Sequence, residues 1–155
     1  ASANPPFNLI DEANPIFTRA RSLAPARILD ANVKKALVTN GAFIEDKVTI
    51  DNSIIGLRCH VGQGASVKNT IVMGADFYES DCDRTDEIGE LPPVGIGSGT
   101  VIEGAIVDKN ARIGQNCRIA MREGLEPNCD INGVYIRDGI ICIPKDAILP
   151  SGWKL

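Results

Sequence analysis

Few residues in this chain have both the type and the spacing that chemistry requires. The sequence contains one histidine, His60, which is the natural candidate for a general base. Between Met73 and Val94 a single arginine, Arg84, accompanies seven carboxylates: Asp76, Glu79, Asp81, Asp83, Asp86, Glu87 and Glu90. Carboxylates can bind a cation, but this spacing matches no calcium-binding loop. We therefore interpret the segment as a solvated excursion.

The five cysteines do not show the spacing of a metal site or of a disulfide framework. Cys59 and Cys117 fall where small apolar residues recur, so they are predicted to be small buried hydrophobes in a reducing compartment. The glycine-rich stretch 94–99 carries no basic residue, unlike a phosphate-binding loop. No side chain is spaced as a nucleophile with its base. On its own residues the chain is predicted to be non-catalytic and to hold no cofactor.

The elements that must position these residues repeat every six positions. In residues 98–119 aliphatic side chains recur at Val101, Val107, Ile113 and Ile119. A small residue precedes each by two places: Gly99, Ala105, Ala111 and Cys117. Helices space like residues three or four apart and plain strands two apart, so this period predicts short strands separated by corners. Three strands would form a triangular coil of about 18 residues, and stacked coils would form an all-β prism with aliphatic columns inside.

The same pattern begins at residue 28. Its pairs of small or modest residue and aliphatic residue are Ala36/Val38, Ala42/Ile44, Val48/Ile50, Ser53/Ile55, Cys59/Val61, Ala65/Val67 and Thr70/Val72. The step is five instead of six at Ile50 to Ile55 and at Val67 to Val72, which a tighter corner can absorb. Two irregular excursions, Met73–Val94 and Ala120–Gly133, interrupt the repeat. Residues 1–27 lack the period and contain four prolines, so we expect a strap or linker there and one domain over 28–155.

Composition narrows the classes of function. A chain of 155 residues suffices for one sizeable domain, and 44% hydrophobic but only 5% aromatic residues suit a core of aliphatic columns. A net charge of −4 argues against nucleic acid as a partner. No apolar run is long enough to span a membrane, and no signal-peptide pattern opens the sequence, which favours a cytoplasmic protein.

Particular strings make the chain resemble a known family. They are Asn14-Pro-Ile-Phe-Thr18 with Arg21, Ser53-Ile-Ile-Gly-Leu-Arg58, Met73-Gly-Ala-Asp-Phe-Tyr78, Ile106-Val-Asp-Lys-Asn-Ala-Arg-Ile-Gly114, and Tyr135-Ile-Arg-Asp-Gly139 followed by Lys145-Asp-Ala147. Together they resemble the C-terminal left-handed parallel β-helix domain of ADP-glucose pyrophosphorylase (glucose-1-phosphate adenylyltransferase), which is built from hexapeptide repeats. The resemblance covers the whole chain.

The resemblance implies a function. In that family an N-terminal nucleotidyltransferase domain, using Mg²⁺ and ATP, makes ADP-glucose and pyrophosphate from glucose 1-phosphate for glycogen or starch synthesis. The β-helix domain serves regulation and assembly into homo- or hetero-oligomers, usually tetramers. This sequence lacks the catalytic domain, so the chain alone is not expected to catalyse the reaction. In a plant or alga the expected location would be the plastid stroma.

The resemblance also implies a site. Family effectors are phosphorylated metabolites and phosphate, and the matched positions are Lys109 and Lys145, with Arg21 in the strap and Asp108 beside the first lysine. The chemistry agrees, because a phosphate dianion needs several cationic donors. Lys109 and Lys145 each follow an inward aliphatic residue by two places, but the sequence does not establish whether they share a corner.

Two other functions remain open for a hexapeptide-repeat prism. Acyltransferases of this architecture usually need a histidine base, so such an activity would depend on His60. A purely structural assembly module would bind no phosphorylated effector. Zinc carbonic anhydrases of this architecture are excluded, since they need three histidine ligands and the sequence has one.

Overall fold

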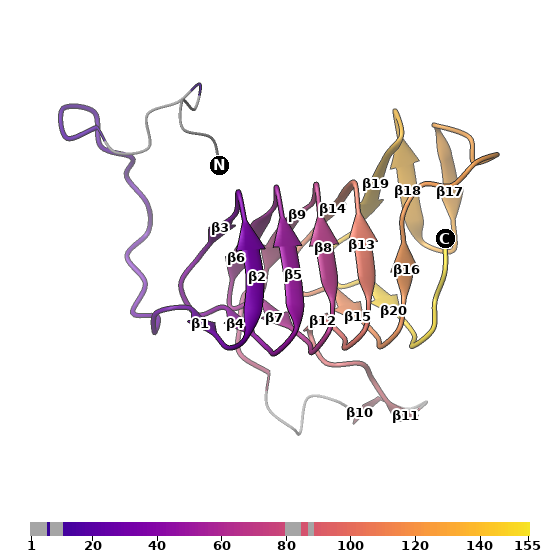
Figure 1. Cartoon of the computed structure of the whole chain (residues 1–155), viewed down its shortest axis with the longest axis horizontal. Coiled ribbons are helices and arrows are strands. Elements are labelled where there is room, and N and C mark those ends of the chain that lie inside the picture. The colour runs from indigo at the N-terminus through magenta and orange to yellow at the C-terminus, as the bar shows by residue number, and fades with distance from the viewer. Residues whose placement is uncertain (1–5, 7–10, 80–84, 87–88) are drawn as a thin grey trace.

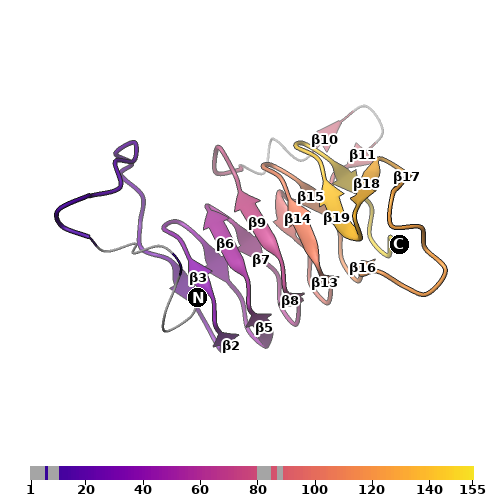
Figure 2. The same cartoon turned by 90° about the horizontal axis from the view of Figure 1, so that it is seen from above.

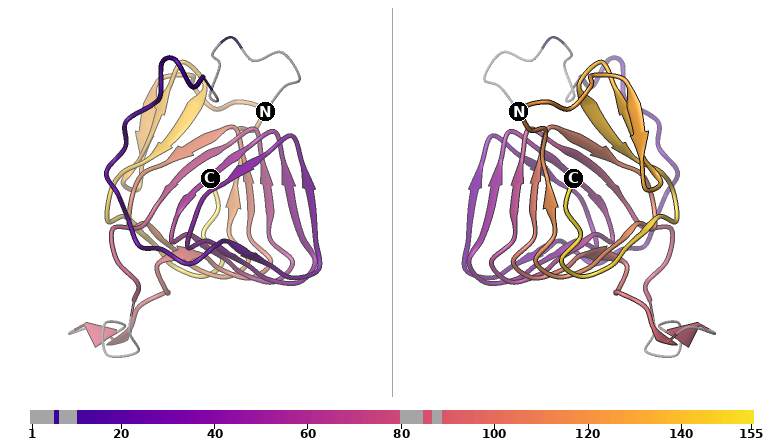
Figure 3. Two further views of the ribbon diagram at one scale, coloured as in Figure 1. Left: turned by 90° about the vertical axis from the view of Figure 1, so that its left-hand side faces the viewer. Right: turned by 90° about the vertical axis from the view of Figure 1, so that its right-hand side faces the viewer.

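The chain forms a three-sided prism of stacked β-coils in a computed structural model, which describes residues 6, 11–79, 85–86 and 89–155. No helix occurs among these residues, and seen end-on the coils have a triangular outline (Figure 3). Three sheets, here called A, B and C, run along the sides of the prism (Figures 1 and 2). The predicted all-β prism is confirmed.

Apart from β17 and β18, the strands of each sheet recur once per coil. Sheet A contains β1 (Arg27–Ile28), β4 (Phe43–Ile44), β7 (His60–Val61), β12 (Gly95–Ile96), β15 (Arg112–Ile113) and β20 (Ile148–Leu149). Sheet B contains β2 (Ala31–Lys34), β5 (Val48–Asp51), β8 (Ser66–Lys68), β13 (Val101–Glu103) and β16 (Arg118–Ile119). Sheet C contains β3 (Leu37–Val38), β6 (Ile54–Leu57), β9 (Ile71–Gly74), β14 (Ala105–Val107), β19 (Ile140–Ile143), β18 (Val134–Arg137) and β17 (Cys129–Ile131).

The coil is shorter than predicted. Val33, Ile50 and Val67 lie in register on successive coils, 17 positions apart. The missing residue is at the corner between sheets B and C, where buried positions step by five, as from Ile50 to Ile55. Each coil has a residue with positive φ at this corner: Lys35, Asn52, Asn69 and Gly104. The side chain of Asn52 also donates to Asn69 Oδ1 of the next coil at 2.9 Å.

The same corner corrects one predicted core position. Ile102, not Val101, points inward with 0% exposure, and Thr100 takes the small inward slot in place of Gly99. A third five-residue step, from Ile102 to Val107, accounts for the shift. The other aliphatic positions predicted in residues 98–119 are buried, as are the predicted pairs from Ala42/Ile44 to Thr70/Val72.

The first excursion is attached to the prism through Glu79 and Arg112. Where it starts, Glu79 forms an ion pair with Arg112 of β15, and the two side chains are only 7% and 12% exposed. Where it returns, Arg112 donates to the carbonyl of Pro92 at 2.8 Å and Val94 N donates to Glu79 Oε2 at 3.0 Å. Both ends are thus fixed to sheet A, while a short hairpin of β10 (Thr85–Asp86) and β11 (Gly89–Glu90) projects from the prism (Figure 3). Asp81, Asp83, Arg84 and Glu87 lie outside the described residues.

The second excursion ends in a β-strand, β17, which leads into a meander. Strands β17, β18 and β19 form an antiparallel meander that extends sheet C, and Val134 and Ile136 in it are fully buried. The prediction of an irregular piece through Gly133 is therefore wrong for residues 129–131. The meander sets the register that the sequence leaves open, since β19 pairs in parallel with β14, with Val107 opposite Ile143.

The strap meets the first coil before β1. Gly41 N donates to Ala24 O at 2.8 Å, and Arg27 N donates to Ala42 O at 2.8 Å. Residues 11–26, the described part of the strap, contain no strand and extend away from the prism (Figure 1). None of the described segments is a helix long and apolar enough to cross a membrane.

Candidate functional site

The two family-matched lysines come from successive strands of sheet C. Because Val107 pairs with Ile143, Lys109 and Lys145 occupy equivalent positions just beyond β14 and β19, at the corner between sheets C and A. Asp146 N donates to Lys109 O at 3.0 Å, which stacks the two turns directly. The chain leaves the preceding coil at the same corner, immediately after β9. It therefore places Asp76 beside both lysines.

These three charged side chains and the amide of Asn110 form one polar cluster, the lysine corner, defined here as Asp76, Lys109, Asn110 and Lys145. Lys109 Nζ lies 2.6 Å from Asp76 Oδ1, and Lys145 Nζ lies 3.2 Å from Asp76 Oδ2. Each ammonium thus contacts a different oxygen of one carboxylate. All three side chains remain about half exposed, at 40% for Asp76, 41% for Lys109 and 50% for Lys145. The corner is therefore accessible to a dissolved anion.

The side chain of Asn110 connects the parts of the lysine corner through hydrogen bonds. It is only 7% exposed and has a φ of +60°, a conformation that asparagine adopts more readily than most residues. Its Oδ1 accepts from Asp76 N at 2.9 Å, and its Nδ2 donates to Asp146 Oδ1 at 3.0 Å. One side chain therefore bridges the coils that carry Asp76 and Lys145.

The hydrogen bonds in the lysine corner favour the ionised forms of Asp76 and Lys145. Hydrogen bonds from Lys109 and then from Lys145 lower the pKa of Asp76 to about 2. In return, the hydrogen bond to Asp76 raises the pKa of Lys145 above its ordinary value. At neutral pH the corner therefore holds a carboxylate anion between two ammonium groups. This chemistry suits an oxyanion with two or more acceptor oxygens.

The other two predicted site residues are placed differently. Asp108 Oδ1 accepts from Lys109 N at 2.7 Å, so its carboxylate contacts the backbone of the turn. Arg21 is exposed on the strap, where its guanidinium donates to Arg19 O at 3.3 Å. The strap joins the first coil and Lys109 lies on the fourth, so the described contacts do not bring Arg21 to the lysines. Sequence reasoning missed Asp76 and Asn110 as members, although Asp76 lies in a family string and an asparagine at a corner marks a positive φ.

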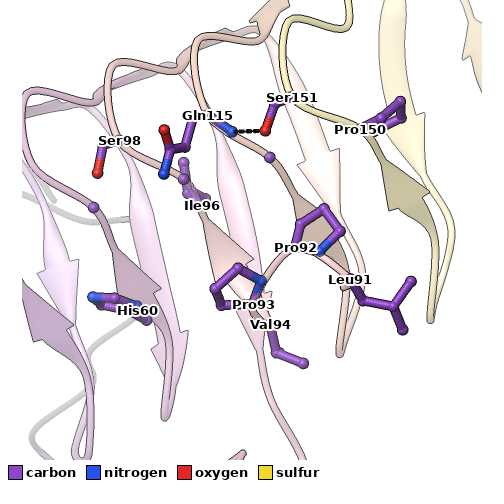
Figure 4. Close-up of a pocket in the computed structure, with 13 residues that line it drawn as sticks. His60, Leu91, Pro92, Pro93, Val94, Ile96, Ser98, Gln115, Pro150 and Ser151 are labelled. Atoms are coloured by element: carbon purple, nitrogen blue, oxygen red, sulfur yellow. Dashed lines mark hydrogen bonds between the residues drawn. The ribbon is translucent and has the colours of Figure 1, made fainter. Parts of the chain in front are cut away.

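A larger groove, of about 500 Å³, lies elsewhere, on sheet A beneath residues 91–94 (Figure 4). Its walls include Pro92, Pro93, Ser98 and Gln115, and His60 is the one titratable residue among those that line it. A groove without a lysine or arginine in its lining has no charge partner for a phosphate. The lysine corner, not this groove, has the groups that a phosphorylated ligand needs.

His60 lies at one edge of this groove and points outward from sheet A. Its Nε2 is 2.9 Å from Glu45 Oε1, and its ring stacks on Phe43 with centroids 5.4 Å apart. Glu45 Oε2 also accepts from Gln63 N at 2.8 Å, which fixes the pair. Among the described residues no serine, threonine or cysteine side chain bonds to the imidazole. Glu45 and Phe43 thus hold the imidazole in a fixed orientation on the surface of sheet A.

Four of the five cysteines lie in the part of the chain that the structure describes. Cys59 and Cys117 are each 2% exposed in the small inward slot, as predicted, and burial raises the pKa of the Cys59 thiol to about 12. Cys129 and Cys142 are half-buried, and all four of these thiols are free. Within the described residues no group of three or more His, Cys, Asp or Glu side chains is placed to hold a metal ion.

The fold places the chain in the class of three-sided parallel β-helix proteins, and the lysine corner adds a polar cluster at one edge of the prism. Comparison with known proteins narrows the class. A family model described as the GLGC left-handed parallel β-helix domain matches residues 21–153, so the chain belongs to this family and the predicted left-handed fold is confirmed. The chain is also 39% identical, over 151 residues, to the glucose-1-phosphate adenylyltransferase small subunit, chloroplastic/amyloplastic, of Triticum aestivum. That match covers 96% of this chain but 32% of the wheat protein, so the chain spans about a third of its relative's length.

Proposed function

We propose that this chain is the regulatory and oligomerisation domain of a glucose-1-phosphate adenylyltransferase, and that Lys109 and Lys145 bind the phosphate of its effectors. The enzyme joins ATP and glucose 1-phosphate to form ADP-glucose and pyrophosphate in glycogen or starch synthesis. The nucleotide, Mg²⁺ and sugar phosphate would bind in an N-terminal nucleotidyltransferase domain, within the two thirds of the relative that this chain does not match. The location, cytoplasm or plastid stroma, remains a prediction.

One observation carries the proposal. Two ammonium groups from successive coils approach separate oxygens of one carboxylate, at 2.6 and 3.2 Å. A pair of cations that already holds one oxyanion can hold a phosphate in the same way, with charge-assisted hydrogen bonds. The half-exposed position leaves room for the rest of a metabolite. Asp108 would help by fixing the Lys109 turn, and Arg21 would take part only if the strap changed course in the assembled enzyme.

A second feature supports the assembly role. The outward positions of sheet C form an apolar stripe in register along the prism: Leu37, Ile54, Ile71, Ile106, Cys142 and Tyr135. The five large side chains of this stripe are 37 to 43% exposed. A continuous apolar band on a flat face is typical of protein contact surfaces. We assign it to contacts with the rest of the enzyme, in the same or a neighbouring subunit.

The effector role predicts the behaviour of a double variant, Lys109→Ala with Lys145→Ala, in the full-length enzyme. Losing two charge-assisted contacts should weaken the response to phosphate and phosphorylated effectors by about tenfold to a hundredfold. Thermal stability should change little because both side chains are exposed. The measurement is the rate of ADP-glucose synthesis against effector concentration, together with a melting curve.

A matched control is the double variant Lys34→Ala with Lys68→Ala, which removes two exposed lysines from sheet B. It should retain the normal effector response, since neither lysine is near the corner. An unchanged response in the Lys109, Lys145 variant would leave the chain as a structural assembly module. An equal loss in both variants would indicate a general charge effect and would also contradict the site.

A further inference from the structure

The lysine corner already contains an anion, which is the carboxylate of Asp76. We propose that Asp76 is a built-in competitor, which occupies the lysine pair in the absence of effector and which a phosphate must displace. The inference rests on the proposed effector role of Lys109 and Lys145 and adds a residue that sets how much effector is needed. It also predicts that the two lysines bind dianions in preference to ligands with a single carboxylate.

The backbone fixes Asp76 in this position. Ala75 is 4% exposed, its N donates to Leu57 O at 2.7 Å, and Arg58 donates to its carbonyl at 3.2 Å. The next amide, Asp76 N, donates to Asn110 Oδ1 at 2.9 Å. The carboxylate is therefore tethered over the lysines, where its effective concentration is high. A free anion has to compete with an internal one.

The side chain itself can still leave. Its contacts with Lys109 and Lys145 are exposed ion pairs, which are individually weak and exchange readily with solvent. The hydrogen bond that Asn110 Nδ2 donates to Asp76 Oδ2 is long, at 3.4 Å. A phosphate dianion carries more charge and more acceptor oxygens than a carboxylate, so it gains more from the same two ammonium groups. A monoanionic carboxylate offers only what Asp76 already provides. The tethered aspartate thus discriminates in favour of phosphate-bearing ligands.

Asp76 also affects the lysine corner after a phosphate has bound to it. Once displaced, its carboxylate remains near the phosphate, and two like charges a few ångströms apart repel each other even in water. Removing the charge should therefore strengthen anion binding, first by vacating the lysines and then by relieving this repulsion. An aspartate that merely stabilised the corner would have the opposite effect, because its loss would leave the lysines less well positioned.

The test is the affinity of this chain for inorganic phosphate, measured by calorimetry or NMR titration in low salt. Asp76→Asn should bind phosphate about three- to tenfold more tightly than the unmodified chain, and the preference for phosphate over acetate should narrow. Asp76→Ala should show the same gain, without an amide oxygen that could replace the carboxylate. Melting curves establish that each variant is folded.

Asp146→Asn is the matched control. It removes the same charge from the same corner, at a residue with a φ of +58° that asparagine tolerates and whose carboxylate bonds to Asn110 instead of the lysine ammonium groups. It should give a much smaller gain. Equal gains for both variants, or an Asp76→Asn variant that binds phosphate no better than the unmodified chain, would overturn the competitor role. Phosphate binding in neither the unmodified chain nor the Asp76 variants would overturn the effector site itself.

A second readout follows displacement directly. Sulfate remains a dianion in mild acid, so the Asp76 carboxyl can be titrated by NMR with and without it. The lysine hydrogen bonds hold this pKa near 2 in the free chain, so saturating sulfate should raise it. If sulfate binds while the Asp76 carboxyl shows no titration in mild acid, the carboxylate has not been displaced.

Discussion

Replacing Ile113 by aspartate should lower the free energy of unfolding by roughly 3 to 5 kcal/mol. Ile113 is 0% exposed, and its register neighbours on sheet A, Ile96 and Leu149, are also buried. A carboxylate there would be an unpaired buried charge, or would force a coil open to reach water. Thermal or denaturant unfolding of the variant measures the loss.

Ile106→Asp provides the comparison. This isoleucine lies on the neighbouring sheet but points outward and is 37% exposed, so the same substitution should cost under about 1 kcal/mol. Similar melting temperatures for the two variants would show that the inward and outward faces have been assigned wrongly.

The second large effect is expected at the ion pair that anchors the first excursion. Arg112→Ala would leave Glu79 charged in a site where its side chain is 7% exposed, which typically costs about 3 to 5 kcal/mol. The excursion can detach to return Glu79 to water, so we expect local opening before global unfolding. The amide of Val94, which donates to Glu79, should lose protection from hydrogen exchange while Ile113 keeps its own.

Two further variants make this prediction specific. Arg112→Ala combined with Glu79→Ala should recover part of the lost stability, because no charge is left buried. Arg118→Ala, an exposed arginine on sheet B, should have little effect on stability. If Arg112→Ala leaves both the melting curve and Val94 exchange unchanged, the pair does not anchor the excursion.

The sequence predicted the architecture well because the fold is encoded locally. Each buried pair, such as Cys59/Val61, repeats a spacing that short strands and corners require. The exception, Val101, has a physical cause. Val101 and Ile102 are both aliphatic and adjacent, so the six-residue period alone selects the wrong one when a five-residue corner follows at Gly104.

Side-chain partners across the coils were harder to predict. Lys109 and Lys145 meet because the antiparallel meander aligns β19 with β14, and no local pattern in residues 120–133 indicates that register. Asp76 and Glu79 were interpreted as solvated acids, since their cationic partners lie more than 30 positions away in sequence. Such pairs have no period, so only the assembled prism reveals them.

The central claim is that the corner of Lys109 and Lys145 binds a phosphate. The most direct test is a structure of this chain determined at high phosphate concentration. We expect an anion within hydrogen-bonding distance of Lys109 Nζ and Lys145 Nζ, with the Asp76 carboxylate turned away from both. A corner that still holds Asp76 between the two lysines, with phosphate bound elsewhere or not at all, would contradict the claim.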